Sequence, residues 1–341
     1  MEKWKILNTL FAFAFGVLSA LSNAKAMWNF PEERSGVSLF RRSIAAFEGE
    51  VVTPSATPEK GIVLLLVPPT DIWGPSYSFS CLRLFVVPAC IEVLGARCFY
   101  DCEPFSQIAF EAGSRLRKME EKAFSGSGLQ SICIPPLVET LGAFCFSHCS
   151  FLASVVFEKD SRLQTIEEHA FQKSYLLRSF VLPSSVRRMG VWCFSEGHAL
   201  VSFAFTGNPR FTRIEKGTFA STRLSSICVP ASVEVLEAWC FCGCRFLAVV
   251  TRAPGSRLRD IEERAFSNSG LRSLELPMSV QVVGSKCFEF CRSLLSVTFG
   301  PDSQLERIAE DAFAGSPQVW VVLPNGEGYS AEQLDQGWTR Q

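Results

Sequence analysis

The chain has 341 residues, of which 48% are hydrophobic and 20% are charged, and its formal net charge at pH 7 is -1. This composition lies outside the range of disordered proteins and supplies enough apolar material for a large buried core. The balanced charge gives no sign of a nucleic-acid-binding protein or of a polybasic membrane surface.

The first 26 residues have the order of a secretory signal peptide. Two early lysines precede an apolar run from Leu10 to Leu21, and small residues follow up to Ala26. We therefore expect a protein that is secreted or displayed at the cell surface. No later stretch reaches the roughly 18 apolar residues of a membrane-spanning helix, so the mature chain is expected to have no transmembrane span. Two alternatives remain open: a short N-terminal helix, or a true start at Met27, which would make the protein cytoplasmic.

Residues 27–81 are predicted to form an N-terminal cap with one degenerate coil. Ile62–Val67 is the expected strand of that coil, with Ile72 pointing inward. Five prolines between positions 54 and 75 make the region irregular.

From Leu82 to Pro324 the sequence repeats itself. Prolines that end a recurring tripeptide, such as Val86-Val-Pro88, lie 47 or 48 residues apart, at Pro88, Pro135, Pro183, Pro230, Pro277 and Pro324. Each block divides into two similar halves of about 23 and 24 residues, within the range of leucine-rich repeats. The predicted coils begin at Leu82, Phe105, Leu129, Leu152, Leu177, Leu200, Leu224, Leu247, Leu271 and Leu294, which makes ten coils.

Each coil is expected to contain one strand and one turn. In Leu271–Leu276 the last two leucines alternate with Ser273 and Glu275, as in a strand, and strands of successive coils would pair in parallel. The segment Ile-x-x-x-Ala-Phe spaces apolar residues at helical intervals over only one or two turns, so it would close the coil by burying its phenylalanine. The prediction is a right-handed, β-rich repeat solenoid with a parallel sheet on the concave side and short helical turns on the convex side. Residues 325–341 are predicted to cap its end.

The repeat resembles the BspA-like class of leucine-rich repeats, found in surface proteins of bacteria and parasitic protists. The resemblance rests on Leu-x-x-Ile-x-Leu-Pro-x-Ser-Val and Ile-x-x-x-Ala-Phe-x-x-Cys patterns, present in variant form at Leu224–Val233 and Ile261–Phe266. It implies a leucine-rich-repeat stack and a role as an adhesin or extracellular-matrix binder. One departure is Arg252, which replaces a strand phenylalanine, so we expect either a bend in that coil or a guanidinium group that reaches solvent.

Fourteen cysteines behind a signal-like start would ordinarily suggest disulfides. The Cys-Phe-x-x-Cys turns, however, occur only in alternate coils. Coils stack about 4.8 Å apart, so equivalent cysteines would lie about 10 Å apart. That separation exceeds the limit of about 7 Å for a bridge. We predict buried free thiols, with Cys242 exposed. No set of four convergent ligands indicates zinc.

No catalytic residues, cofactor site or metal site are predicted. The three histidines lie at unrelated positions of the repeat, and sequence motifs for phosphate binding or hydrolysis are missing. An enzyme would require a cluster of titratable groups that the sequence does not indicate.

The outward strand positions are predicted to form the binding face, as in other solenoids. The candidate residues are Ser131, Ser154, Val156, Ser179, Val181, Ser202, Ser226, Thr251, Ser273, Glu275, Ser296 and Thr298. Their alternative role is a serine ladder that only permits tight stacking. We expect a monomeric, non-enzymatic adhesion or recognition module with a protein ligand, such as a host-surface or matrix protein, and no nucleic-acid partner. The alternative is an intracellular interaction scaffold, favoured by the unbridged thiols and the lack of a glycosylation motif.

Overall fold

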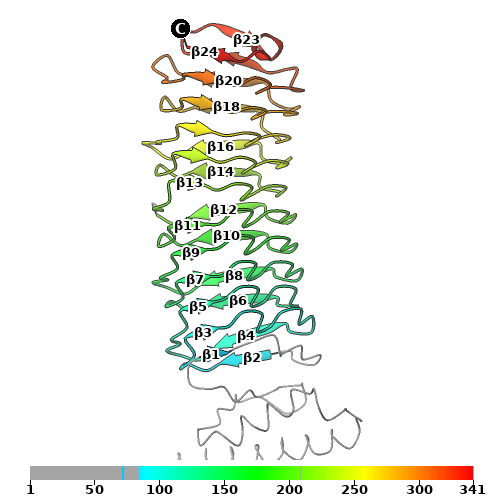
Figure 1. Cartoon of the computed structure of the whole chain (residues 1–341), viewed down its shortest axis with the longest axis vertical. Coiled ribbons are helices and arrows are strands. Elements are labelled where there is room, and N and C mark those ends of the chain that lie inside the picture. Colours follow the sequence, from blue (N-terminus) through cyan, green and yellow to red (C-terminus); the bar gives the residue numbers. More distant parts are fainter. Residues whose placement is uncertain (1–70, 73–83, 208, 341) are drawn as a thin grey trace, which may run out of the picture. The chain divides into compact units, whose positions relative to one another are not determined.

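The computed structural model describes residues 71–72, 84–207 and 209–340. All of them belong to one compact unit, Thr70–Gln341, in which the coils lie one above the next (Figure 1). The predicted signal peptide, the strand Ile62–Val67 and most of the predicted N-terminal cap lie outside the described residues.

The ten predicted coils are confirmed, because each contributes one four-residue strand that begins two residues after the predicted start. The strands are β2 (Leu84–Val87), β4 (Gln107–Phe110), β6 (Ser131–Ile134), β8 (Ser154–Phe157), β10 (Ser179–Leu182), β12 (Ser202–Phe205), β14 (Ser226–Val229), β16 (Val249–Arg252), β18 (Ser273–Leu276) and β20 (Ser296–Phe299). A shorter strand, β22 (Trp320–Val322), follows them. Pairing between successive coils is parallel, with the hydrogen-bonded ladder interrupted after β8, β12 and β16.

A second parallel ladder, which the sequence did not predict, is formed by two-residue strands. They are β1 (Asp71–Ile72), β3 (Val93–Leu94), β5 (Lys118–Met119), β7 (Thr140–Leu141), β9 (Thr165–Ile166), β11 (Arg188–Met189), β13 (Arg213–Ile214), β15 (Val235–Leu236), β17 (Asp260–Ile261), β19 (Val282–Val283) and β21 (Arg307–Ile308). Each coil therefore has two strands and a third side made of turns.

The third side is made of tight turns where short helical turns were expected. The Lys122 and Phe124 amides donate to the Ala143 and Cys145 carbonyls of the next coil, both at 2.8 Å. The Ser125 amide closes a four-residue turn onto the Lys122 carbonyl. Lys122 has a positive φ of 56°. The amides that an α-helix would use internally are thus bonded to the neighbouring coil, and the described residues contain only one helical element, the 3-10 helix η1 (Glu332–Leu334).

The core is a column of stacked phenylalanines, one from each coil. Adjacent rings have centroids 5.2–5.8 Å apart and planes within 11° of each other. The column consists of Phe99, Phe124, Phe146, Phe171, Phe194, Phe219, Phe241, Phe266, Phe288 and Phe313, all fully buried. The predicted burial of the turn phenylalanine is therefore confirmed, and each coil covers the apolar face of the next.

A column of small polar side chains lies beside the phenylalanines. The Cys149 thiol donates to the Phe124 carbonyl of the preceding coil at 3.0 Å, and the Ser174 hydroxyl donates to the Phe146 carbonyl at 3.3 Å. Nine of the thirteen described cysteines are buried, and none of the thirteen forms a disulfide. Cys242 is half-buried, so the prediction that it is exposed is wrong. Their predicted burial follows from this position, where either a thiol or a hydroxyl satisfies a buried carbonyl.

The C-terminal residues pair with the last strands in the opposite direction. β23 (Gly328–Ser330) lies antiparallel to β22, and β24 (Trp338–Thr339) lies antiparallel to β21. This pairing uses the backbone groups that the last parallel strands of both ladders would otherwise leave open at the edge.

Candidate functional site

The candidate site is the outward surface of the four-residue strands, which we call the ladder face. Side chains alternate along each strand, so the second and fourth residues enter the core while the first and third point outward. The first residues of successive strands lie in register, as do the third residues, for example Ser131 with Ser154 and Cys133 with Val156. The face therefore consists of two parallel rows.

The structure places ten of the twelve predicted residues in exposed positions on these rows. They are Ser131, Ser154, Val156, Ser179, Val181, Ser202, Ser226, Thr251, Ser273 and Glu275. Ser296 and Thr298 are half-buried, because they lie beside the bulkier residues Trp320 and Val322 of the last strand. Both residues nonetheless belong to the outward-facing positions of β20.

The ladder face carries little charge and consists mostly of small side chains. From β6 to β14 its two rows contain serine, valine, alanine and cysteine, without a carboxylate or an amine. Val156 and Val181 are 52% and 51% exposed and form its main apolar contribution. Burial raises the pKa of the Cys133 thiol, so this exposed cysteine stays protonated at neutral pH. Such a surface offers shape and apolar area more than directed polar contacts.

Two large, exposed apolar side chains of the same rows were missed. Val249 occupies the first-row position opposite Ser226 and is 50% exposed, and Trp320 occupies that position opposite Ser296. The template spacing was a sufficient signal for Val249, which interrupts the serine row in the coil of Arg252. Trp320 ends the row with an aromatic side chain of the kind that anchors interfaces.

Arg252 reaches solvent, as one of the two expectations for it proposed. Its guanidinium donates to the Glu275 carbonyl at 3.0 Å and lies 3.7 Å from the Glu275 carboxylate. A cavity of about 20 Å³, lined by Val229, Leu258 and Phe266 among others, lies beneath the strand where a phenylalanine would pack. The arginine thus leaves an apolar space in the core that is large enough for about one water molecule.

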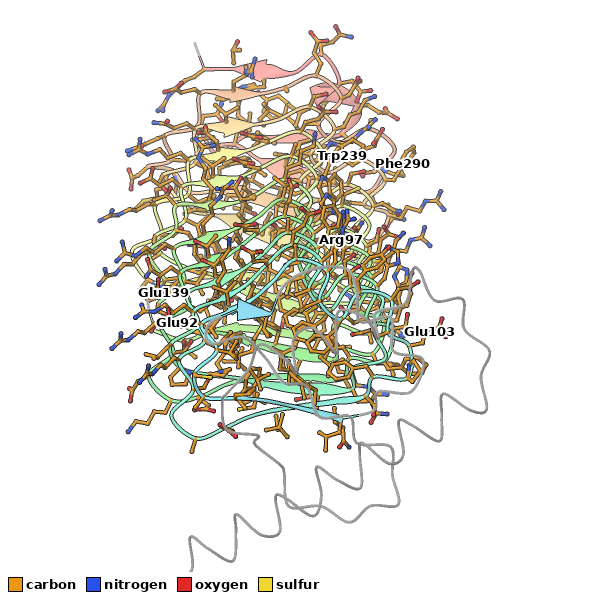
Figure 2. The ribbon with its side chains drawn as sticks, turned by 60° about the horizontal axis from the view of Figure 1, so that its bottom comes forward. Glu92, Arg97, Glu103, Glu139, Trp239 and Phe290 are labelled. Atoms are coloured by element: carbon orange, nitrogen blue, oxygen red, sulfur yellow. The ribbon has the colours of Figure 1, made fainter. Side chains whose placement is uncertain are left out.

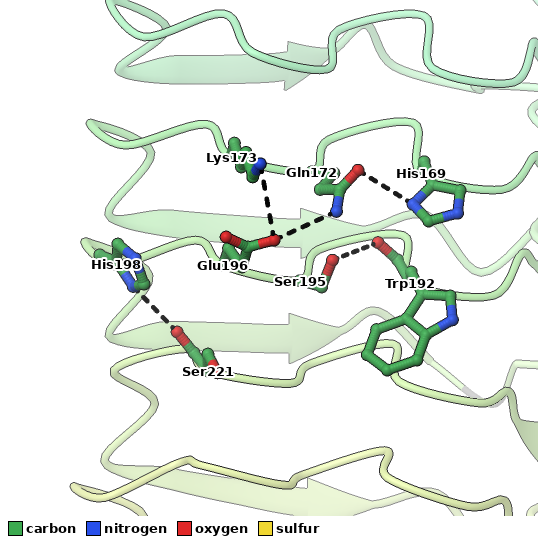
Figure 3. Close-up of polar contacts among 8 residues, drawn as sticks. All are labelled: His169, Gln172, Lys173, Trp192, Ser195, Glu196, His198 and Ser221. Carbon is green, nitrogen blue, oxygen red and sulfur yellow. Dashed lines mark hydrogen bonds and ion pairs between the residues drawn. The ribbon is translucent and has the colours of Figure 1, made fainter.

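The turn side holds the histidines without joining them into one site. The His169 ring stacks on the Phe144 ring, with centroids 4.6 Å apart. The His169 Nδ1 lies 3.0 Å from the Gln172 amide oxygen, and the His198 Nδ1 lies 3.1 Å from the Ser221 carbonyl oxygen (Figure 3). Burial, followed by the nearby Lys173, lowers the pKa of His148. Within the described ranges, no three His, Cys, Asp or Glu side chains are grouped as metal ligands.

Adjacent acidic residues recur on the turn side, for example Glu167–Glu168 and Glu262–Glu263, and one member of each pair contributes to the contact between coils. The first carboxylate of a pair accepts a hydrogen bond from a backbone amide of the preceding coil, as Glu167 does from Ala143 at 3.0 Å and Glu262 from Ala238 at 3.1 Å. The second residue, such as Glu168, is exposed. The first member of such a pair thus satisfies a backbone amide of the preceding coil.

None of the described residues form a helix with the length and apolar content that a bilayer crossing requires.

Comparison with curated proteins gives no match. Among solved structures, the pneumococcal vaccine antigen PcpA is 20% identical to this chain, with a TM-score of 0.49. The alignment covers 73% of this chain and 64% of the PcpA chain. A leucine-rich cell surface protein from Faecalibacterium prausnitzii is 18% identical, with coverages of 79% and 86% and a TM-score of 0.39. A leucine-rich repeat protein from Bacteroides ovatus is 19% identical, with coverages of 79% and 92% and a TM-score of 0.41.

The family comparison is more specific than these structural likenesses. The model of the BspA-type leucine-rich repeat region matches residues 72–201 and 212–326 in 6 copies. The matched residues include the four-residue strands of all ten coils apart from β12, together with the phenylalanine column. The chain therefore belongs to the BspA-type leucine-rich-repeat family.

Proposed function

We propose that the protein is a non-enzymatic adhesion or protein-recognition module that binds a host-surface or matrix protein through the ladder face. The observation that carries this proposal is the pair of exposed rows on successive parallel strands, uncharged from β6 to β14. Stacked repeats use such extended surfaces for recognition. Family membership supports a recognition role, since this repeat class builds surfaces rather than catalytic centres.

The chemistry of the ladder face favours a broad, modest interaction. Serine hydroxyls are small and offer one hydrogen-bond donor each, while Val156, Val181 and Val249 supply apolar area. Few of the large aromatic or arginine anchors that dominate tight interfaces are present, Trp320 being the exception. Affinity would then come from the number of coils in contact, and a monomer with several contacts suits adhesion through many weak interactions.

Export to the cell surface or medium is part of the proposal and is supported by the signal-like first 26 residues. A second candidate, an intracellular interaction scaffold that starts at Met27, is favoured by the lack of disulfides among the described cysteines. N-terminal sequencing of the protein from its native host separates them. A start near Lys25 or Met27 in the secreted or surface fraction supports export, and an unprocessed or Met27-initiated cytosolic protein contradicts it.

The binding role is tested by placing a large charged side chain in the serine row. Ser202→Arg in the full chain should weaken binding to a panel of immobilised extracellular-matrix proteins at least tenfold, which corresponds to about 1.4 kcal/mol. Ser293→Arg, an exposed serine outside the two rows, is the matched control and should stay within about twofold. Unchanged binding by the Ser202 variant, or no binding of the wild type to any panel member or to host cells, contradicts the proposal.

A further inference from the structure

Basic side chains gather on the second ladder, on a side of the coil distinct from the ladder face. Three successive coils contribute five exposed arginines, which we call the arginine band: Arg162, Arg187, Arg188, Arg210 and Arg213. Figure 2 shows nitrogen-tipped side chains projecting along the edge of the stack that carries Glu92 and Glu139. This concentration contrasts with a formal net charge of -1 for the whole chain.

The fold sets the spacing of the band. Arg188 lies on β11 in register with Thr165 of β9, and the Arg187 amide donates to the Gln164 carbonyl of that coil at 2.8 Å. Arg162 and Arg210 each precede their two-residue strand by three positions, so they repeat one template position two coils apart. With about 4.8 Å per coil, the band extends about 10 Å along the stack.

Most of this positive charge is not neutralised within the protein. Among the described residues only Arg213 of the band forms an ion pair, with Glu237 at 2.9 Å. Glu215 lies near Arg188 and Arg213, and its pKa is raised by burial and by Glu237. No aspartate or glutamate occurs from Leu177 to Phe194.

Of the other carboxylates in these coils, Glu167 accepts a hydrogen bond from the Ala143 amide at 3.0 Å. Three more lie at the start of the band. Glu139 is already engaged by Arg117 at 3.3 Å. Glu158 and Asp160 are exposed at the bend before the first arginine of the band, with Lys159 between them. The three coils of the band therefore present a surface with excess positive charge.

We propose that the arginine band binds a linear anionic polysaccharide through its sulfate or carboxylate groups. A guanidinium group can hold an oxyanion through two parallel hydrogen bonds, and the coil repeat places such groups at regular steps along a line. None of the exposed aromatic or large aliphatic side chains of the described residues lies in the segments that carry the band. Base stacking of a single-stranded nucleic acid and insertion into a bilayer therefore have no anchor here.

The test compares three variants of the full chain in titrations with heparin, a linear sulfated polysaccharide, at several salt concentrations. Replacing Arg187, Arg188 and Arg210 by glutamine should lower affinity at least tenfold and reduce the salt slope by about 2 to 3. The same triple change to lysine keeps the charge but removes the paired N–H donors of the guanidinium group. The heparin affinity of this variant should fall between those of the wild type and the glutamine variant. The charge-matched control replaces Arg245, Arg272 and Arg292, three exposed arginines outside the band, by glutamine. Its heparin affinity should stay within about twofold of wild type.

Several outcomes overturn the proposal. Equal losses in the band variant and the charge-matched control would mean that binding follows net charge alone. No heparin binding by the wild type would remove the site. Tighter binding to duplex DNA or to anionic phosphatidylserine vesicles than to heparin would assign the band to a different class of partner. Far-UV circular dichroism of each variant establishes that the solenoid is retained.

Discussion

Replacing Arg252 by phenylalanine should stabilise the protein. In the neighbouring coils the fourth strand residue is apolar, and Phe299 at the equivalent position is only 2% exposed. The Arg252 side chain instead turns outward and is 39% exposed. A cavity of about 20 Å³ lies beneath it. A phenylalanine would occupy that space together with the volume now taken by the arginine stem.

The expected gain follows from three contributions. Burial of a phenylalanine side chain is worth about 1.5–3 kcal/mol relative to leaving it exposed. The lost ion pair with Glu275 is exposed and worth about 0–1 kcal/mol, and the lost hydrogen bond to the Glu275 carbonyl is worth about 0.5–1.5 kcal/mol. The cavity is small, so burial gains toward the lower end apply and some adjustment of the neighbours is needed. We expect a net increase in unfolding free energy of about 1 kcal/mol, or roughly 2–4 °C in Tm.

The assay is urea and thermal unfolding followed by far-UV circular dichroism, with Arg245→Phe as the control. Arg245 is exposed, so its replacement adds the same ring without burial and should change stability by less than about 0.5 kcal/mol. A loss of stability in the Arg252 variant, or a change no larger than that of the control, would refute the reasoning that an apolar space is left unfilled there.

Three further changes test the packing of the stack. Phe194→Ala removes a ring with centroids 5.2 and 5.8 Å from its stacked neighbours and should cost about 3–5 kcal/mol in urea unfolding, whereas Phe151→Ala at a 56% exposed site should cost under about 1 kcal/mol. Gly190→Ala places a Cβ 2.3 Å from the backbone of the preceding coil and should cost about 1–3 kcal/mol in the same assay, while Gly300→Ala, whose nearest neighbour is 3.9 Å away, should be nearly neutral. Burial raises the pKa of Cys149 from 9.0 to about 12, so its contribution to stability is complete below pH 9 and is lost as the pH rises toward 12. Cys149→Ser should therefore reduce the fall in unfolding free energy between pH 9 and 11 by up to about 1.4 kcal/mol per pH unit, and an unchanged alkaline profile would contradict this.

The repeat itself could be predicted from the sequence because its signals are redundant. The proline spacing, the alternation in the strands and the recurring phenylalanine each give the same period, so a departure at one position, such as Arg252, does not change the register. Every coil then needs its neighbours to bury its apolar face, which makes the stack the only arrangement consistent with the pattern.

The second ladder and the turns could not be predicted in the same way. A two-residue strand is too short to show alternation, and its pairing depends on the neighbouring coil. In the turns, Trp192 and Trp239 adopt positive φ angles of 56° and 66°, which bulky residues rarely do. Their conformation is set by hydrogen bonds to the next coil, and spacing within one chain segment does not reveal those bonds.

The candidate site was predictable in its position but not in its detail. Alternation placed the serine row outward, and ten of twelve candidate side chains are exposed. The half-burial of Ser296 and Thr298 depends on the last strand, which departs from the template. The arginine band was not recognised because its members come from three positions of the repeat, whose proximity depends on the second ladder.

The most direct test of recognition through the ladder face uses the native cysteines as reporters. Cys133 and Cys228 are exposed in the second row of the face, whereas Cys90 is exposed outside it. The unmodified protein is bound to a partner from the matrix panel, or to intact host cells, and alkylated with a maleimide whose sites are read by peptide mass spectrometry. We predict that binding slows alkylation of Cys133 and Cys228 at least several-fold and leaves Cys90 unchanged. Equal alkylation of the two face cysteines with and without the bound partner would contradict the account.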